Sequence, residues 1–297
     1  NQGTNLSISG VGFEPSLDKG KKRSGDSNHW LFDAVRGTTK MLSSDGTGAE
    51  ETQSGVTAFG SDGFTLGTWI GSTKTNDSYV AWNWKANGSG STNTDGDVTS
   101  VVSANVDAGF SIVTYTGNGS NIDIGHGLSK APEIVIVKVR NDTGGWIMNL
   151  KNIPSQSAGT DMVGYLNTTA QIDGENVGQY YFGTQAPTSS VFRVQNKADV
   201  GGNGENLVAY CFHSVDGYSK IGSYTGNGNA NGTFVHTGFD VKWLLIKNVE
   251  GAYNWMLMDN ERSAFNMVEK SLNPNSSGAE SSSDVDIDFL SNGFKLR

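Results

Sequence analysis

The sequence predicts an all-β protein made of tandem antiparallel β-sandwich units. Gly, Asn, Ser and Thr together supply 125 of the 297 residues, which is typical of a chain rich in turns. Short β-branched or aromatic segments are separated by these turn residues roughly every 8–12 positions, and helical periodicity is weak throughout. A run of about eight such strands per unit is the pattern of a sandwich or jelly roll.

The strands are placed from their local composition and from the turns beside them. Asn118-Gly119 and Asn227-Gly228 predict tight turns, because both residue types tolerate positive φ. The expected strands span residues 29–33, 63–67, 78–85, 111–116, 133–140, 145–150, 190–195, 206–213, 219–224, 242–248 and 254–259. A short helix is expected near residues 262–270.

Internal repeats divide the chain. Residues 111–119 recur at 220–228, and residues 59–66 recur at 289–296. We therefore expect three β-sandwich units, at residues 1–104, 105–216 and 217–297. We expect these units to stack end to end into an elongated molecule.

The first and third units depart from the shared pattern. The first is divergent and N-terminally incomplete, and it has Leu-Asp-Lys-Gly-Lys at residues 17–21 where the others have an apolar strand. Because a central strand would bury its charges, either this segment lies at an edge or in a loop, or the first unit is built differently. The third is C-terminally incomplete, since it lacks a counterpart of the strands at 79–84 and 207–212. We favour truncation, with cleavage or a strand from a neighbouring subunit as the alternatives.

Composition and charge exclude several classes. The net charge is −9, from 21 Lys and Arg against 30 Asp and Glu, so nucleic acid is not an expected partner. The one basic run, residues 19–23, is interpreted as a solvated loop. No apolar stretch approaches the ~20 residues of a membrane helix, so no membrane insertion is expected. Cys211 is the only cysteine, and its strand-like surroundings predict a buried, unreactive thiol.

Several motifs together carry a family resemblance. They are Gly-Phe-Ser-Ile-Val-Thr-Tyr-Thr-Gly-Asn-Gly at residues 109–119, His126-Gly127-Leu128 with a following Ala-Pro, a Trp-x-x-x-Asp-x-x-Arg motif at Trp255, and Asp-Phe-Leu-Ser-Asn-Gly-Phe at residues 288–294. With them the whole chain resembles a repeat domain of uncharacterised function, abundant in virion structural and tail-fibre-like proteins of marine bacteriophages. The resemblance implies a concanavalin-like or jelly-roll sandwich, a virion location and a structural or host-recognition role. It implies no catalytic residues.

The residues give no sign of an enzyme. Neither a Gly-x-Ser-x-Gly nor a Walker motif occurs, the histidines lack zinc spacing, and nothing selects a catalytic carboxylate pair. We therefore assign no catalytic residue. His126 and His236 occupy equivalent repeat positions and are expected to fix loops by hydrogen bonding.

Calcium is the ion that the sequence favours. Alternating carboxylates place oxygens, the preferred ligands of Ca²⁺, on one side of an extended segment. They are Asp95 and Asp97 in one run, and Asp284, Asp286 and Asp288 in another. Neither run has the full spacing of a calcium loop, so a solvated acidic loop is the alternative. No other cofactor is expected.

The aromatic residues fall into two groups. Three tryptophans recur beside apolar residues at one place in each unit and are expected in the core. They are Trp30, Trp146 and Trp255. Trp69, Tyr180 and Tyr181 lie instead in unit-specific loops, which makes them the candidates for stacking on a glycan ligand.

Three functions remain to be weighed. The first is a non-enzymatic phage virion structural protein, such as a tail-fibre, spike or decoration component, that mediates assembly and host-surface adhesion. Its partners would be other virion subunits in a homo-oligomer such as a trimer, and a host surface glycan or protein; its location would be the virion or the extracellular space. The second is a secreted or surface carbohydrate-binding protein, and the third, ranked last, is a glycan depolymerase.

Overall fold

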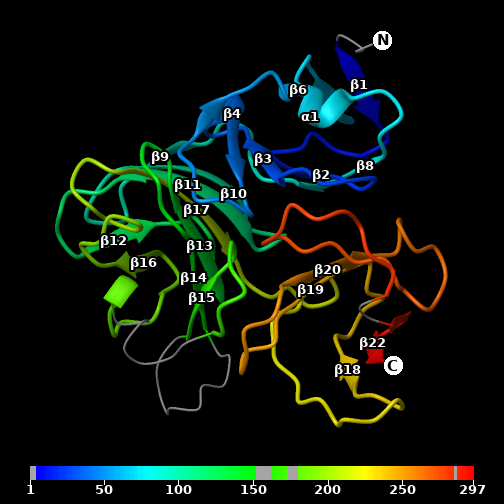
Figure 1. The fold of residues 1–297 in the computed structure, drawn as a ribbon. Coiled ribbons are helices and arrows are strands. Elements are labelled where there is room, and N and C mark those ends of the chain that lie inside the picture. The colour runs from blue at the N-terminus through cyan, green and yellow to red at the C-terminus, as the bar shows by residue number, and fades with distance from the viewer. Residues whose placement is uncertain (1–4, 152–161, 173–179, 284–285) are drawn as a thin grey trace.

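The computed structural model describes residues 5–151, 162–172, 180–283 and 286–297. Its regular structure is almost entirely antiparallel β-sheet, which confirms the all-β sandwich class. Figure 1 shows three lobes: a blue-to-cyan first lobe, a green second lobe and a yellow-to-red third lobe. Among the described residues, no helix is long and apolar enough to cross a membrane.

The first lobe packs two sheets face to face. Its elements are β1 (Leu6–Ser9), β2 (Leu17–Lys22), β3 (Trp30–Asp33), β4 (Gly37–Ser43), β5 (Glu51–Thr52), β6 (Val56–Gly60), β7 (Gly63–Leu66), the single helical turn α1 (Ile70–Thr73) and β8 (Tyr79–Trp84). The large sheet has the order β5-β4-β3-β2-β8, and the small sheet has the order β1-β7-β6. Trp30 and Phe32 of the large sheet are buried against Val56 and Phe64 of the small one.

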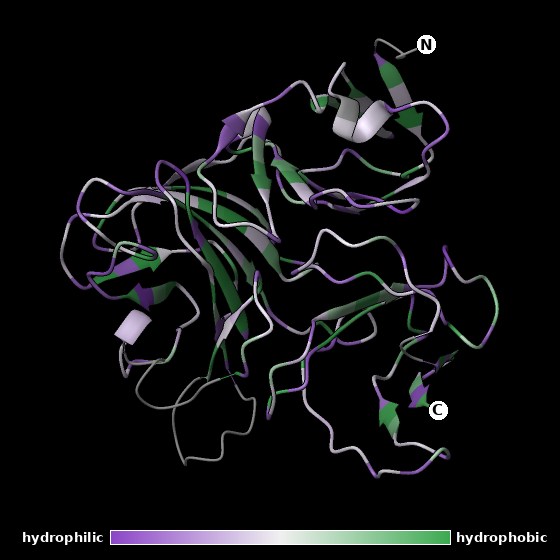
Figure 2. Cartoon of the chain, in the orientation of Figure 1, coloured by the Kyte–Doolittle hydropathy of each residue, from purple (hydrophilic) through white to green (hydrophobic). Residues whose placement is uncertain are grey.

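The second lobe repeats this plan on a larger scale. Its strands are β9 (Ser91–Asn93), β10 (Ser100–Asn105), β11 (Phe110–Thr116), β12 (Ile122–Gly125), β13 (Ile134–Val139), β14 (Trp146–Leu150), β15 (Met162–Tyr165), β16 (Val191–Val194) and β17 (Asn206–Phe212). The large sheet has the order β15-β14-β13-β17-β11-β10-β9, and β12 pairs with β16. The unit boundary expected at 104/105 therefore lies inside β10. Figure 2 shows apolar residues concentrated in these strands and polar residues in the loops.

The third lobe has fewer strands. They are β18 (Phe234–His236), β19 (Trp243–Ile246), β20 (Met256–Asp259), β21 (Ile287–Leu290) and β22 (Gly293–Leu296), in the sheets β19-β20 and β18-β22-β21. The strand expected at residues 219–224 is wrong, because no described strand pairs with this segment. The helix expected at residues 262–270 is also wrong. There the segment forms turns and bends, the Asn266 side chain bonds the backbone of Phe289, and Val268 bridges to β21.

β2 carries charged residues and is nonetheless a buried central strand, paired by β3 on one side and β8 on the other. The edge or loop expected at residues 17–21 is therefore wrong. Lys19 Nζ donates to Ser44 Oγ at 2.8 Å, and Lys21 Nζ donates to the Ser277 carbonyl at 3.1 Å. Because each ammonium group has hydrogen-bond partners, the cost of burying it is offset.

The three lobes close into a triangle, so the elongated end-to-end arrangement is also wrong (Figure 1). Trp82 of the first lobe packs directly with Leu257 and Leu272 of the third. A central cluster joins side chains from all three lobes. Its members include Leu17, Leu31, Leu42, Ile112, Trp146, Met148, Leu150, Ile172, Val208, Tyr210 and Trp255, with Leu245 and Val249 packed against them. The large sheets of the first two lobes are thus covered on both faces, which accounts for the uninterrupted apolar run in β13.

Candidate functional site

The most extensive polar contacts occur where the lobes meet. We call these contacts the 2–1, 3–2 and 1–3 junctions, after the lobes they join. At each, a lysine in or directly after one of the equivalent strands β2, β13 and β19 donates to a loop carbonyl of the neighbouring lobe. The pairs are Lys138 to Thr47 at 3.3 Å, Lys247 to Thr169 at 3.1 Å and Lys21 to Ser277 at 3.1 Å. One geometry therefore occurs at all three junctions and closes the triangle.

A second contact has the same threefold pattern and lies within each lobe. The residue that pairs across from a lobe's junction lysine donates its backbone N–H to a side-chain oxygen of its own lobe. That oxygen lies two positions before the carbonyl that the neighbouring lobe's lysine contacts. The pairs are Trp146 with Asn167 at 2.9 Å, Trp255 with Asn275 at 2.9 Å and His29 with Asp45 at 2.8 Å. His29, not Trp30, is therefore the counterpart of the other two tryptophans, and the expected equivalence is wrong by one residue.

The one-residue shift separates two roles. Trp146 Nε1 donates across its junction to the Ser43 carbonyl at 2.8 Å, and Trp255 Nε1 donates to the Tyr165 carbonyl at 3.0 Å. Trp30 stays inside its own lobe, because neighbouring residues of a strand point to opposite faces. All three tryptophans are buried, as expected for core residues.

The 2–1 junction contains a buried ion network. Arg140 donates to both oxygens of Glu50, through Nε at 2.9 Å and Nη2 at 3.0 Å. Arg36 Nη1 reaches the same carboxylate at 3.1 Å and pairs with Asp33 through Nε. Tyr210 completes the network from the second lobe, donating its hydroxyl to Asp33 at 2.7 Å. Asp33 and Glu50, two carboxylates of the first lobe, are thus bound by side chains of the first and the second lobe.

The 1–3 junction contains the same network with different residues. Arg23 donates to both oxygens of Glu280 at 2.9 Å. Arg262 bonds Glu280 at 3.0 Å and Asp259 at 2.7 Å. Here the indole of Trp82 takes the place of the tyrosine hydroxyl and donates to Asp259 at 3.0 Å.

The 3–2 junction replaces these ions with apolar side chains. Two positions after the junction lysine the other junctions have arginine, and this one has Val249. Three positions after the loop carbonyl they have glutamate, and this one has Ile172. Leu150 occupies the place of the aspartate, as its pairing within the sheet shows. All three side chains belong to the central cluster.

The junction carboxylates are held in their charged form. Burial alone would raise the pKa of Glu50, but hydrogen bonds from Arg140 and the charge of Arg36 outweigh it, so the pKa is lowered. Glu280 behaves in the same way: burial opposes Arg23 and Arg262, and the pKa falls. A carboxylate bound by two guanidinium groups is poorly suited to accept a proton from a substrate, so this chemistry serves to hold the lobes together.

The aromatic candidates lie apart. Trp69 is half-buried in the first lobe, with its ring edge-on to Trp30 at 5.7 Å. Tyr180 and Tyr181 lie together in the second lobe, with ring centroids 4.8 Å apart. Tyr180 is 51% exposed, and Lys197 Nζ lies 3.8 Å from its ring centroid. The structure therefore offers an exposed ring at Tyr180 and does not bring Trp69 to it.

The calcium candidates do not converge. Asp97 lies in a turn where it accepts the backbone N–H of Asp123 at 2.8 Å, and Asp95 accepts from Asn93. Within the described part of the chain, no three His, Cys, Asp or Glu residues form a group that could hold a metal ion.

The second acidic run is divided. Asp286 is exposed, Asp288 is buried and paired with Arg297, and Asp284 lies outside the described residues.

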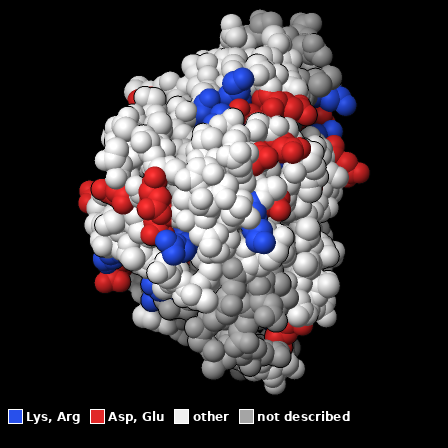
Figure 3. Space-filling view, turned by 90° about the vertical axis from the view of Figure 1, so that its left-hand side faces the viewer, with Lys and Arg blue, Asp and Glu red and all other residues white. Residues whose placement is uncertain are grey.

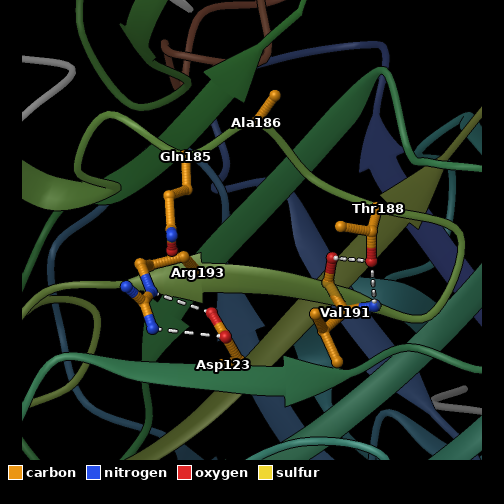
Figure 4. A pocket seen from close by; sticks show the side chains of 6 residues that line it. All are labelled: Asp123, Gln185, Ala186, Thr188, Val191 and Arg193. Carbon is orange, nitrogen blue, oxygen red and sulfur yellow. Dashed lines mark hydrogen bonds and ion pairs between the residues drawn. The ribbon is translucent and has the colours of Figure 1, made fainter.

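A surface hollow of about 370 Å³ lies in the second lobe (Figure 4). Its lining residues are Asp123, Gln185, Ala186, Thr188, Val191 and Arg193. Arg193 donates to both oxygens of Asp123, at 2.8 and 3.2 Å. Nearby, His126 bonds the Thr188 carbonyl and the Leu128 N–H, which is the loop-fixing role expected of it.

The thiol of Cys211 is fully buried as expected, and burial raises its pKa to about 12.

Sequence reasoning missed the junction residues as a group. The Trp-x-x-x-Asp-x-x-Arg motif contains Asp259 and Arg262, and Glu50 and Glu280 occupy equivalent repeat positions. Those signals mark a recurring cluster. They do not reveal that its partners, Arg140 and Arg23, come from a different lobe.

Comparison with known proteins places the chain in one family. No curated protein and no solved structure matches it. The model of a domain of unknown function, DUF7483, matches residues 1–297. The chain therefore belongs to the DUF7483 family.

Proposed function

We propose that this protein is a non-enzymatic structural component of a phage virion, such as a tail-fibre, spike or decoration protein, that contributes to assembly and host-surface adhesion. One observation carries the proposal: two buried ion networks and a shared apolar cluster lock three lobes into a single body. Moving one lobe away would leave the charges of these ion pairs without their partners, at a large cost in free energy. The ion pairs therefore favour one fixed arrangement of the lobes. The resemblance to tail-fibre-like proteins supports the virion setting.

The surface is consistent with this role. Figure 3 shows that charged side chains are few on the second-lobe side and that uncharged residues form most of it. Polar, uncharged surface can form interfaces with other subunits without the cost of desolvating isolated charges. Homo-oligomerisation belongs to the proposal, and a trimer is the form we favour.

The direct test is location. An antibody raised against the recombinant chain should label purified virus particles from the source material in electron micrographs, and mass spectrometry of those particles should detect the protein in stoichiometric amount. A protein found only in the cell fraction would contradict the proposal. Light scattering should give a multiple of the 31.5 kDa chain mass.

Carbohydrate binding is the second candidate, and the exposed ring of Tyr180 favours it. Aromatic faces stack on sugar rings, and the Asp123–Arg193 hollow in the same lobe offers hydrogen-bonding groups for hydroxyls. Binding to a glycan array should be lost in Tyr180→Ala and kept in Tyr224→Ala, a matched change at an exposed tyrosine of the third lobe. Equal binding by both variants would contradict this site.

A further inference from the structure

Among the described residues, the third lobe has no strand at the place of β8 and β17. β8 pairs with β2 in the first lobe, and β17 pairs with β13 in the second. β19 occupies the same place in the third lobe, yet among the described residues it pairs only with β20. Its second edge therefore has backbone groups with no strand partner.

A second segment of the third lobe, residues 219–225, also lacks the strand partner that its counterpart in the second lobe has. In the second lobe, β17 lies between β13 and β11 and pairs with both. Residues 219–225 match β11 in sequence but form no strand, and they cross Figure 1 as an extended yellow segment. The two matching edges that β17 joins in the second lobe therefore have no joining strand among the described residues of the third.

Burial marks the same gap. Val135 and Val137 of β13 are fully buried, whereas Leu244 and Ile246 at the matching positions of β19 are only half-buried. Most of the large apolar side chains that are exposed among the described residues belong to the third lobe. They are Tyr218, Tyr224, Phe234, Trp243, Tyr253, Phe265 and Met267. This lobe exposes apolar surface that its counterparts cover.

We propose that the gap between β19 and residues 219–225 is a binding site for one extended strand of another chain, with the apolar pattern of β8 and β17. The strand would add by antiparallel pairing, with main-chain hydrogen bonds for affinity and alternate side chains for specificity. This site does not depend on the proposed virion role.

The pairing in the other lobes defines the chemistry of the ligand. Tyr210 and Trp82 lie across from Ile136 and Lys19, which correspond to Leu245 of β19. Both aromatics reach across a junction, to Asp33 and Asp259. At the 3–2 junction the matching group is Leu150, so we expect an aromatic residue across from Leu245 that packs on Leu150. A small residue is expected across from Ile246, where the other lobes have alanine.

A peptide with the sequence of residues 205–213, carrying C211S, tests the site on the complete chain. Bound peptide should slow amide hydrogen exchange of residues 219–225 and of β19 by on the order of tenfold, and should leave β13 unchanged. The control peptide adds A209P, which removes a donor from the middle of the strand and should not bind. Ile221→Lys, in the unpaired segment, should weaken binding without disturbing the sheets.

A second arm distinguishes the source of the strand. The same segment is appended to the C-terminus through a flexible linker. Protection by the free peptide supports a strand donated by another chain. Protection only in the linked form, or in neither arm, would overturn the proposal. So would a dimer paired through β19 that the peptide does not displace.

Discussion

The 2–1 and 3–2 junctions solve the same packing problem with opposite chemistry. Both have a lysine on a loop carbonyl and a tryptophan indole on a second carbonyl. Around these contacts one junction has Arg140 and Glu50, and the other has Val249 and Ile172.

The comparison separates geometry from stabilisation. Backbone-directed contacts are the same at both junctions, so they position the lobes. The surrounding side chains differ, and a buried ion pair can be exchanged for apolar groups of similar volume when all its members change together. Changing one member leaves a buried charge without its partner, and the two junctions should therefore respond very differently to single substitutions.

The largest effect is expected from Arg36→Leu. This change leaves Asp33 and Glu50 buried with less compensation, at a cost of about 3–5 kcal/mol in the free energy of unfolding. Urea unfolding measures it. As a matched control, the combined variant D33L/R36M/E50I/R140V/Y210F gives the 2–1 junction the chemistry of the 3–2 junction. The combined variant should recover most of the free energy of unfolding that Arg36→Leu loses. If it is as unstable as Arg36→Leu, apolar side chains cannot replace this ion network.

A slightly smaller effect is expected at the apolar junction. Ile172→Glu places a carboxylate in the central cluster, where Val249 occupies the place of the arginine that binds glutamate at the other junctions, and should cost about 3 kcal/mol in urea unfolding. Val249→Arg in the same chain should restore part of that stability by recreating the Arg–Glu pair of the other junctions. A double variant no better than Ile172→Glu would show that the two positions do not meet.

The pH dependence should sharpen the contrast further. The pKa values of Glu50 and Glu280 are lowered in the folded chain, so their stabilisation is present above the ordinary glutamate pKa of 4.5 and is lost as the pH falls through the folded values. Thermal melts should therefore show stability falling below about pH 4.5. In E50Q/E280Q this acid slope should be reduced, and an unchanged slope would assign it to other groups.

The smallest effect is expected from the lysine contacts. Lys138→Met removes a fully buried ammonium that donates to the carbonyls of Val139 and Thr47, and should cost about 1–2 kcal/mol. Lys247→Met should cost less, because Lys247 is more exposed. Thermal denaturation of the two variants side by side makes the comparison; the reverse order would show that burial does not set the size of the effect.

Local features of the fold were predictable from the sequence, and long-range ones were not. The strand of Tyr210 and the burial of Trp146 follow from apolar composition and repeat position. β2 looked unfit for the core, because the partner of Lys21 is Ser277, 256 residues away. Residues 219–225 have the composition of β11, but a strand also requires a neighbour to pair with.

The candidate site shows the same limit. Repeat positions identified Glu50 and Glu280 as recurring residues, but the residues that bind them come from another lobe. The closed triangle follows from such contacts, and no local pattern indicates it. Tyr180, by contrast, was identified from its loop and is exposed.

The closure between the first and third lobes is the central claim, and a disulfide cross-link tests it most directly. The backbone N–H of Ser27 donates to the Ser277 carbonyl at 2.9 Å across the 1–3 junction. In S27C/S277C, oxidation of the dilute folded protein should form a disulfide within one chain, seen as a faster-migrating band on a non-reducing gel and a loss of two hydrogens from the chain mass. Free thiols at both positions in the folded protein, or only products that link two chains, would contradict the closed arrangement.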